Sequence, residues 1–182
     1  MKNKFKFASV AVLAMALLIP ASRADQAAIP AGPSGISEKV RHELVMLPFY
    51  SVFDDLNYEV TGDMVTLTGQ VTHPTLKSDA AAVVKRIPGV VAVVNQIEVL
   101  PLSTRDDQLR RAVYLTLFNS NSPLFRYGLG ADPSIHIIVK NGHVRLMGAV
   151  SHESDKQTAT LYVQQLFGVF SVTNDLMVGK VA

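Results

Sequence analysis

The sequence contains no cysteine at any of its 182 positions. Without cysteine the chain forms no disulfide bond and has no thiol nucleophile. It also lacks the residue that is acylated in lipoproteins. No covalent cross-link therefore supports the fold, and anchoring through a lipidated cysteine is excluded.

Hydrophobic runs long enough to cross a membrane are also missing. The apolar segment at residues 7–19 is shorter than the ~20 residues needed to span a bilayer. Three lysines precede it and small residues follow it, so residues 1–24 are predicted to be a secretory signal peptide. A retained N-terminal anchor is the alternative. Cleavage would leave a soluble exported protein, most simply in a bacterial periplasm.

Little net charge remains once this segment is removed. The chain carries 17 Lys and Arg residues against 15 Asp and Glu residues, but four of the basic residues lie within residues 1–24. The basic excess typical of nucleic-acid binding is therefore absent from the mature chain. Residues 36–100 hold five basic and eight acidic side chains, whereas residues 101–182 hold eight and six. This difference between the halves is a lead to function.

The second half of the sequence repeats the first. The segment from Val60 to Val99 aligns without a gap with the segment from Val139 to Val178, an offset of 79 positions. The residues that recur at this offset include Val65, Leu67, Gly69, Val71, His73, Ala80, Val84, Gly89 and Asn95. A unit of this length in two copies indicates two small tandem domains, because solenoid repeats are ~20–50 residues long.

Each copy shows the same order of predicted elements. In the first copy a helix is followed by two strands, which are joined by a tight turn at Gly62-Asp63. Gly69 interrupts the second strand, which predicts either a bulge or close packing of a helix at a position without a side chain. Pro74 opens a second helix, and a third strand follows Pro88-Gly89.

These elements predict an α+β fold with two tandem αββαβ domains, each a three-stranded sheet with two helices packed on one face. The domains span residues 36–100 and 104–179, and residues 25–35 form a flexible leader. Each domain is near the size at which a single core is marginal, and the linker is too short for independent tumbling. We therefore expect the open sheet faces to share an interface that includes apolar residues such as Ile138.

Two motifs occur in both copies. The first copy has Val65-Thr66-Leu67-Thr68-Gly69-Gln70-Val71 and Ile87-Pro88-Gly89-Val90-Val91-Ala92-Val93-Val94-Asn95. The second has Val144-Arg145-Leu146-Met147-Gly148-Ala149-Val150 and Gly168-Val169-Phe170-Ser171-Val172-Thr173-Asn174. In this order these segments resemble the BON domain, named for bacterial osmotically induced and nodulation-associated proteins. The two copies cover nearly all of the mature chain.

This resemblance implies an αββαβ fold, a periplasmic or envelope location and no catalysis. Members of the family are associated with envelope integrity, osmotic stress and, in some cases, binding of anionic phospholipid. The dual-domain lipoproteins of the family are anchored through a cysteine that this chain lacks, so the resemblance is to members with a signal peptide. The family motif is structural and carries no ligand residues, so it implies no cofactor.

The five histidines do not predict a metal site. A two-residue turn at Asn141-Gly142 pairs His143 with Lys140 and places His136 opposite Met147. The two imidazoles are then too far apart along the strands to share an ion. No histidine spacing matches a zinc site, so we expect no bound metal.

Catalytic motifs are equally absent. There is no serine nucleophile elbow, and the paired carboxylates Asp106-Asp107 stand at a helix start, where acidic residues favour the helix dipole. Thr72 and Ser151 occupy matching strand-to-helix junctions, where they are expected to cap the second helix of each domain. The sequence therefore predicts a protein that is not an enzyme.

The second domain carries a group of cations near an aromatic and aliphatic loop. A candidate lipid-binding site combines Arg105, Arg110, Arg111, Arg126, Leu124, Phe125 and Tyr127. Each arginine would attract an anionic headgroup by ~1 kcal/mol, and the apolar loop would insert. Alternatively, the loop residues fill the core, as Phe49 and Phe53 would in the first domain, and the arginines form an ordinary solvated face.

Three functions follow from these observations. The first is a periplasmic envelope-maintenance or osmotic-stress protein whose second domain contacts anionic phospholipid. The second is a chaperone-like protein that holds unfolded exported clients on an apolar surface. The third is a scaffold in an envelope assembly of proteins. The sequence does not define the oligomeric state.

Overall fold

The computed structural model describes residues 33–130 and 133–179, so the predicted signal peptide lies outside the described residues. The first domain contains α1 (Pro33–Val45), β1 (Asp55–Thr61), β2 (Met64–Val71), α2 (Pro74–Lys85), β3 (Ala92–Asn95) and β4 (Glu98–Val99). Of the predicted leader, residues 33–35 belong to α1 instead.

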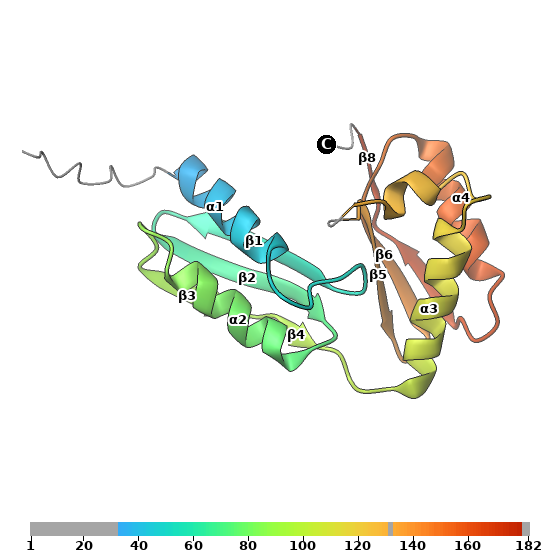
Figure 1. The fold of residues 1–182 in the computed structure, drawn as a ribbon, viewed down its shortest axis with the longest axis horizontal. Coiled ribbons are helices and arrows are strands. Elements are labelled where there is room, and N and C mark those ends of the chain that lie inside the picture. The colour runs from blue at the N-terminus through green and yellow to red at the C-terminus, as the bar shows by residue number, and fades with distance from the viewer. Residues whose placement is uncertain (1–32, 131–132, 180–182) are drawn as a thin grey trace, which may run out of the picture.

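The second domain repeats this order. It contains α3 (Thr104–Phe118), the short 3-10 helix η1 (Phe125–Gly128), β5 (Ile135–Lys140), β6 (His143–Val150), α4 (Glu153–Gln164), β7 (Ser171–Asn174) and β8 (Met177–Val178). The α+β class and the two similar units are as predicted. In each unit two helices cover one face of a mixed sheet (Figure 1).

The middle strand of each sheet pairs with all the others. β2 runs antiparallel to β1 and parallel to β3 and β4, and β6 has the same relations to β5, β7 and β8. Lys140 pairs with His143 and His136 with Met147, which confirms the predicted register of the second hairpin.

The third strand of each domain is interrupted at the same repeat position. Asn95 Nδ2 donates to the Lys77 carbonyl of α2 at 2.6 Å, and its Oδ1 accepts from the Ile97 amide. Asn174 makes the same contacts with Lys156 and Leu176. The side-chain amide thus ties the strand to the second helix and separates β3 from β4 and β7 from β8.

Glycine is required in the middle strand of both domains. Gly69 and Gly148 have φ angles of 118° and 107°. A Cβ atom would lie 2.0 Å from the Asp55 carbonyl oxygen in the first case and 2.2 Å from that of Ser134 in the second. A position that excludes a side chain was expected at Gly69, but the group that excludes it is a carbonyl of the paired strand β1 and not a packed helix.

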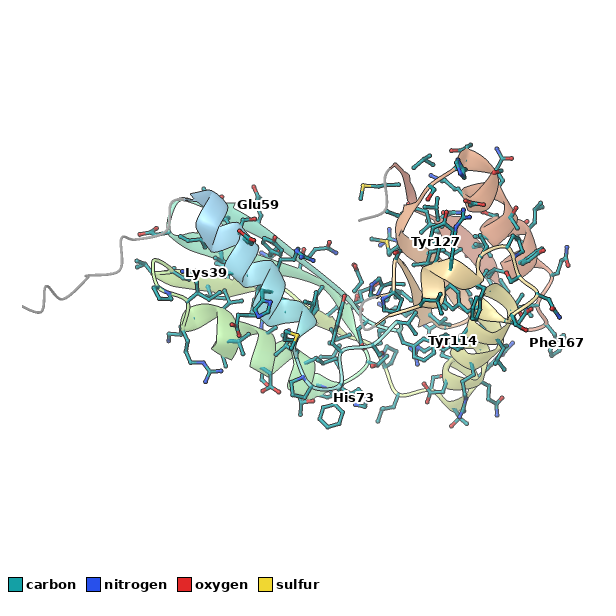
Figure 2. The ribbon with its side chains drawn as sticks, turned by 45° about the horizontal axis from the view of Figure 1, so that its top comes forward. Lys39, Glu59, His73, Tyr114, Tyr127 and Phe167 are labelled. Atoms are coloured by element: carbon teal, nitrogen blue, oxygen red, sulfur yellow. The ribbon has the colours of Figure 1, made fainter. Side chains whose placement is uncertain are left out.

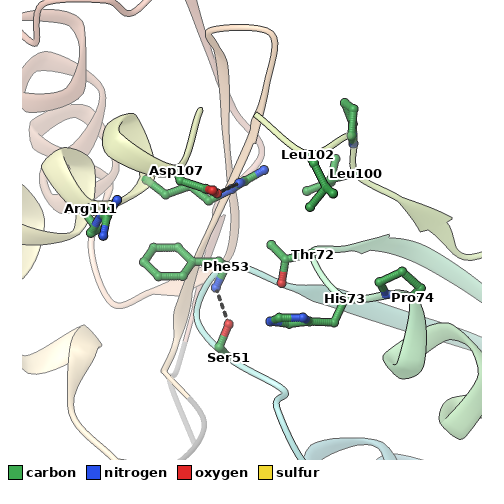
Figure 3. Close-up of a pocket in the computed structure, with 11 residues that line it drawn as sticks. Ser51, Phe53, Thr72, His73, Pro74, Leu100, Leu102, Asp107 and Arg111 are labelled. Carbon is green, nitrogen blue, oxygen red and sulfur yellow. Dashed lines mark hydrogen bonds and ion pairs between the residues drawn. The ribbon is translucent and has the colours of Figure 1, made fainter. Parts of the chain in front are cut away.

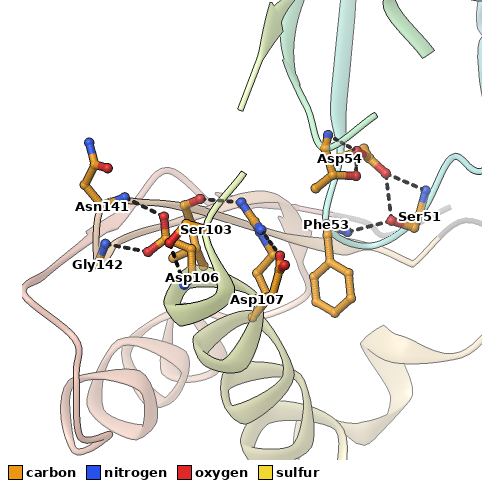
Figure 4. Close-up of polar contacts among 11 residues, drawn as sticks. Ser51, Phe53, Asp54, Ser103, Asp106, Asp107, Asn141 and Gly142 are labelled. Carbon is orange, nitrogen blue, oxygen red and sulfur yellow. Dashed lines mark hydrogen bonds and ion pairs between the residues drawn. The ribbon is translucent and has the colours of Figure 1, made fainter. Parts of the chain in front are cut away.

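The loop between α1 and β1 is held by a buried aspartate. Asp54 is fully buried, and its carboxylate accepts hydrogen bonds from the Thr72 amide and hydroxyl and from the Ser51 amide and hydroxyl (Figure 4). The predicted capping role of Thr72 and Ser151 is wrong, because the N-cap positions are His73 and His152 and neither helix has a side-chain cap. Thr72 donates to the loop instead.

The α1–β1 loop also packs against the second domain. Val52 is 8% exposed and belongs to the core of the second domain, and its carbonyl accepts from the Ile137 amide of β5 at 2.7 Å. Phe53 packs edge-on against Tyr114 of α3. Figure 1 shows the loop reaching from α1 to the edge of the second sheet. The first domain therefore completes the core of the second.

Opposite charges meet at the same interface. Lys140 Nζ contacts Glu98 Oε1 at 2.5 Å, and Gln70 donates to the other Glu98 oxygen at 2.6 Å. The hydrogen bonds from Lys140 and Gln70 lower the pKa of Glu98. Burial raises the pKa of Asp55, against the opposing effects of His136, Asn57 and Arg145. The acidic excess of the first half and the basic excess of the second thus contribute an ion pair between the domains.

The open face of the second sheet contributes to this interface as expected. Ile138 is 3% exposed, although it points away from the helices, and the His136 ring lies 5.6 Å from that of Tyr50. The whole of β5 before Lys140 is buried on both faces. Met177 remains exposed, so only part of the predicted apolar face meets the first domain.

Candidate functional site

The structure places the four predicted arginines in different surroundings. Arg110 is 5% exposed and contacts Asp107 at 2.5 Å. It also donates to the Val139 carbonyl of β5 at 2.7 Å. Arg110 therefore ties α3 to the sheet and is not available to a membrane surface, which corrects the prediction for this residue.

The aromatic loop is also largely internal. Leu124 and Tyr127 lie in the core of the second domain, so the alternative expectation holds for them. The Tyr127 hydroxyl donates to Asp155 at 2.6 Å and accepts from the Ser151 amide at 2.8 Å. Figure 2 shows Tyr127 within the second domain. Phe125 remains exposed.

Arg126 is exposed but already paired. Its guanidinium lies 4.7 Å from the centre of the Tyr127 ring and contacts Asp155 of α4 at 2.7 Å. The hydrogen bond to the Tyr127 hydroxyl is the main cause of the raised pKa of Arg126. Much of its charge is therefore compensated within the domain.

The two remaining arginines, Arg105 and Arg111, are exposed. They line two different hollows, which are described below. Gly128 of η1 lies against Phe118 at the far end of α3, and a 15-residue helix is roughly 22 Å long. The Arg126 segment and Arg105 thus lie at opposite ends of α3, and the seven predicted residues do not form one surface.

Arg105 lies beside an aromatic turn that the sequence reasoning did not identify. A hollow of about 300 Å³ is lined by Arg105, Gly142 and Phe170 among others. Phe170 is 81% exposed, and Phe167, two residues before Val169, is fully exposed. Figure 2 shows Phe167 at the outer edge of the domain. We call Arg105, His143, Phe167 and Phe170 the aromatic tip.

Two contacts organise the aromatic tip. The His143 ring lies edge-on to Phe170 at 4.9 Å, and His143 Nδ1 is 2.7 Å from Ser171 Oγ. The buried Asp106 carboxylate accepts from the amides of Asn141 and Gly142, which fixes the hairpin turn against α3 (Figure 4). Asp106 therefore does more than favour the helix dipole.

A signal for the aromatic tip was present in the repeat. At the offset of 79 positions, Phe167 and Phe170 stand where the first domain has Pro88 and Val91. Two phenylalanines in a turn that the other copy builds without aromatic residues are not required by the fold. Comparison of the copies position by position identifies them.

A second hollow lies between the domains. It has a volume of about 380 Å³ and is formed by the α1–β1 loop, the start of α2, the linker between β4 and α3 (residues 100–103), and α3 itself (Figure 3). Its apolar wall includes Phe53, Pro74 and Leu102, and its polar side includes Arg110 and Arg111. We call it the interdomain cleft.

Among residues 33–130 and 133–179, no group of three or more histidine or acidic side chains is placed to hold a metal ion. Over the same residues, no helix combines the length and apolar character of a membrane span. In both the aromatic tip and the interdomain cleft, arginine lies beside apolar or aromatic groups. This combination suits binding of an anion with an apolar part.

Comparison with protein families identifies both units. The BON domain model matches residues 34–101 and again residues 122–180. The chain belongs to the BON domain family. BON domains are associated with membrane and lipid interaction and with osmotic stress, and the family is generally non-catalytic. Comparison with curated proteins found no match.

Among solved structures, the chain is similar to CdsD, a structural protein of the type III secretion system of Chlamydia trachomatis. One structure, of the C-terminal domain, has 13% identity and a TM-score of 0.34, over 79% of this chain and 96% of that chain. A second has 12% identity and a TM-score of 0.31, over 80% and 93%. Similarity at this level supports no inference about function.

Proposed function

We propose that this BON protein is a non-catalytic envelope protein that adsorbs to anionic phospholipid membranes through the aromatic tip. The observation that carries the proposal is the pair of exposed phenylalanines in one turn, Phe167 and Phe170, of which Phe170 lines the same hollow as Arg105. Phe170 contacts the His143 ring along one edge, yet both phenylalanines leave most of their surface exposed to water.

The chemistry of the aromatic tip fits a membrane interface. Full burial of a phenylalanine side chain contributes about 1.5–3 kcal/mol, and an arginine near anionic headgroups contributes ~1 kcal/mol. Two phenylalanines and one arginine therefore support reversible binding that weakens with salt. The predicted signal peptide supports a periplasmic location for this activity.

The test is flotation of residues 25–182 with phosphatidylglycerol or phosphatidylcholine vesicles at low and high salt. We expect flotation with the anionic vesicles at low salt. The double variant Phe167→Ser/Phe170→Ser should lose most of it, and Arg105→Glu should weaken it. Phe49→Ser is the matched control, because Phe49 is 71% exposed but belongs to the first domain.

A further variant separates the aromatic tip from the loop identified in the sequence. Phe125→Ser changes the one loop residue of that set that is both aromatic and exposed. Flotation that survives Phe167→Ser/Phe170→Ser but is lost in Phe125→Ser would contradict the proposal for the tip. Flotation that is absent with every vesicle would reject lipid binding by the isolated protein.

Client holding is the alternative that the exposed phenylalanines also fit. A chaperone-like activity would suppress aggregation of an unfolded protein without lipid, and it would tolerate Arg105→Glu. Aggregation assays on the same variants therefore distinguish the two functions.

A further inference from the structure

The interdomain cleft joins an apolar wall to a free positive charge. The wall combines Phe53 of the α1–β1 loop, Pro74 of α2 and Leu102 of the linker. Leu102 is 96% exposed, although it borders a hollow of about 380 Å³. This volume lies at the lower end of the ~300–1,000 Å³ range of small-molecule sites. The cleft therefore fits a small ligand with an apolar body.

The two arginines of the interdomain cleft are not equivalent. Arg110 is compensated by Asp107 and is held by the Val139 carbonyl. Its Nε is buried and has no hydrogen-bond partner among the described residues. Arg111 is exposed and forms no ion pair within residues 33–130 or 133–179. The cleft thus offers one uncompensated positive charge.

This charge balance selects the head of the ligand. Asp107 lies at the same cleft and disfavours a second negative charge close to it, because like charges repel at short distance. A guanidinium binds carboxylate or phosphate oxygens through paired N–H donors. One free arginine beside one compensated pair therefore suits a monoanion better than a dianion.

We propose that the interdomain cleft binds a single monoanionic amphiphile, with its head on Arg111 and its hydrocarbon part between Phe53, Pro74 and Leu102. The head is a carboxylate or a phosphodiester, which come from a fatty acid and from a lysophospholipid respectively. This site is separate from the aromatic tip and does not depend on adsorption to a membrane.

A ligand in this position contacts both domains and the linker. Ser51, Thr72 and Pro74 contribute from the first domain, and Asp107 and Arg111 from the second. Occupation therefore stabilises the observed arrangement of the domains, because a ligand that binds only the joined state favours that state.

The experiment titrates the mature protein with decanoate below its micelle-forming concentration, followed by calorimetry and NMR. Decanol and decyltrimethylammonium test the need for the negative charge, and decanoyl lysophosphatidylglycerol tests the phosphodiester source. We expect the two anions to bind and the other two probes to bind at least about tenfold more weakly. Hydrogen exchange at the amide of Leu100, which follows β4 and donates to the Val71 carbonyl, should slow on binding.

Three variants locate the site. Arg111→Gln should weaken decanoate binding about tenfold and Leu102→Ser should also weaken it, whereas Arg105→Gln is the matched control and should not. Circular dichroism checks that each variant is folded. Equal binding of decanol and decanoate, full affinity in Arg111→Gln, or no binding of either anion would overturn the proposal.

The aromatic tip supplies the remaining control. Phe167→Ser/Phe170→Ser should keep its affinity for decanoate even where vesicle flotation is lost. Loss of decanoate binding in this variant would contradict a separate cleft site. Failure of the flotation assay alone leaves the decanoate result to decide the present proposal.

Discussion

The two domains stabilise the same strand-to-helix junction with different residues. In the first, the buried Asp54 carboxylate holds the Thr72 amide. In the second, the Tyr127 hydroxyl holds the matching Ser151 amide and is itself held by Asp155. Asp54 fixes a loop that reaches into the second domain, whereas Tyr127 lies in the core of the domain to which it belongs. The repeated fold therefore allows one loop to form the interface while the other remains within its domain.

The domains also differ in the charged and aromatic side chains on their surfaces. The first domain supplies Asp55 and Glu98 to the interface, and the second supplies Lys140 and the neighbouring Arg145. The aromatic tip exists only in the second domain. The first domain thus contributes the loop that completes the core of the second, and the second domain carries the exposed aromatic turn.

The largest effects are expected where the domains are alike. Gly69→Ala and Gly148→Ala should each destabilise the protein by about 3 kcal/mol or more, because a Cβ atom overlaps a carbonyl oxygen at a positive φ. Urea unfolding followed by circular dichroism measures both. Gly62→Ala is the control, because it has a positive φ but open space around it. Equal losses at Gly62 and Gly69 would contradict the overlap argument.

The next effects should separate the domains. Asp54→Ala should cost about 3 kcal/mol, because it removes four hydrogen bonds and leaves partly buried donors of Ser51 and Thr72 unpaired. Tyr127→Phe should cost about 1–2 kcal/mol, because it keeps the ring in the core. The same unfolding assay compares them, with the exposed Glu59→Ala as control. A larger loss in Tyr127→Phe than in Asp54→Ala would reverse the comparison.

Truncation of Val52 tests whether a side chain of the first domain stabilises the core of the second. Val52→Ala should cost about 2 kcal/mol, and the loss should appear in the second domain although the residue belongs to the first. Hydrogen exchange should become faster in β5 and β6 while β1 and β2 change little. Val91→Ala, at an exposed site, should change neither domain. A loss confined to β1 and β2 would show that Val52 serves its own domain.

The smallest effects concern pH. The raised pKa of Asp55 means that the folded state keeps a proton that the unfolded state has released, so stability should fall as pH rises from about 3.8 through the folded-state pKa. Asp55→Asn should remove this slope. Glu98, with a lowered pKa, should act in the opposite direction and lose its contribution as pH falls below about 4.5 through its folded-state pKa.

Unfolding free energies measured across this acidic range test both signs. Glu98→Gln should remove the stabilisation that is present at the upper end of the range. If Asp55→Asn leaves the fall in stability with rising pH unchanged or steepens it, the partial burial of Asp55 does not raise its pKa.

Features that depend on local pattern were predictable from the sequence. The order of elements and the hairpin register at Lys140 and His143 both follow from neighbours along one strand or turn, whereas the carbonyl that excludes a side chain at Gly69 belongs to the paired strand. The burial of Ile138 was also predictable, because a short linker brings the open sheet face against the other domain.

Features that depend on distant partners were not predictable in the same way. The alternative in which loop residues fill the core placed Phe49 and Phe53 in the first domain, but Phe49 is exposed and Phe53 packs on the second domain. Arg110 looks solvated in sequence, since its helix position does not reveal the Val139 carbonyl that it faces. Such contacts arise from the tertiary arrangement, which a single sequence does not specify residue by residue.

The hydrogen bond between Val52 and Ile137 has a consequence for engineering and for recombination. A gene fragment cut at the linker would encode a second domain with a vacancy in its interior and an unpaired amide on β5. Grafting that domain onto an unrelated partner would require an apolar side chain to fill the vacancy and a carbonyl oxygen to accept from the Ile137 amide. The structural unit is therefore the pair of domains, although the sequence repeats after 79 residues, from Gly69 to Gly148.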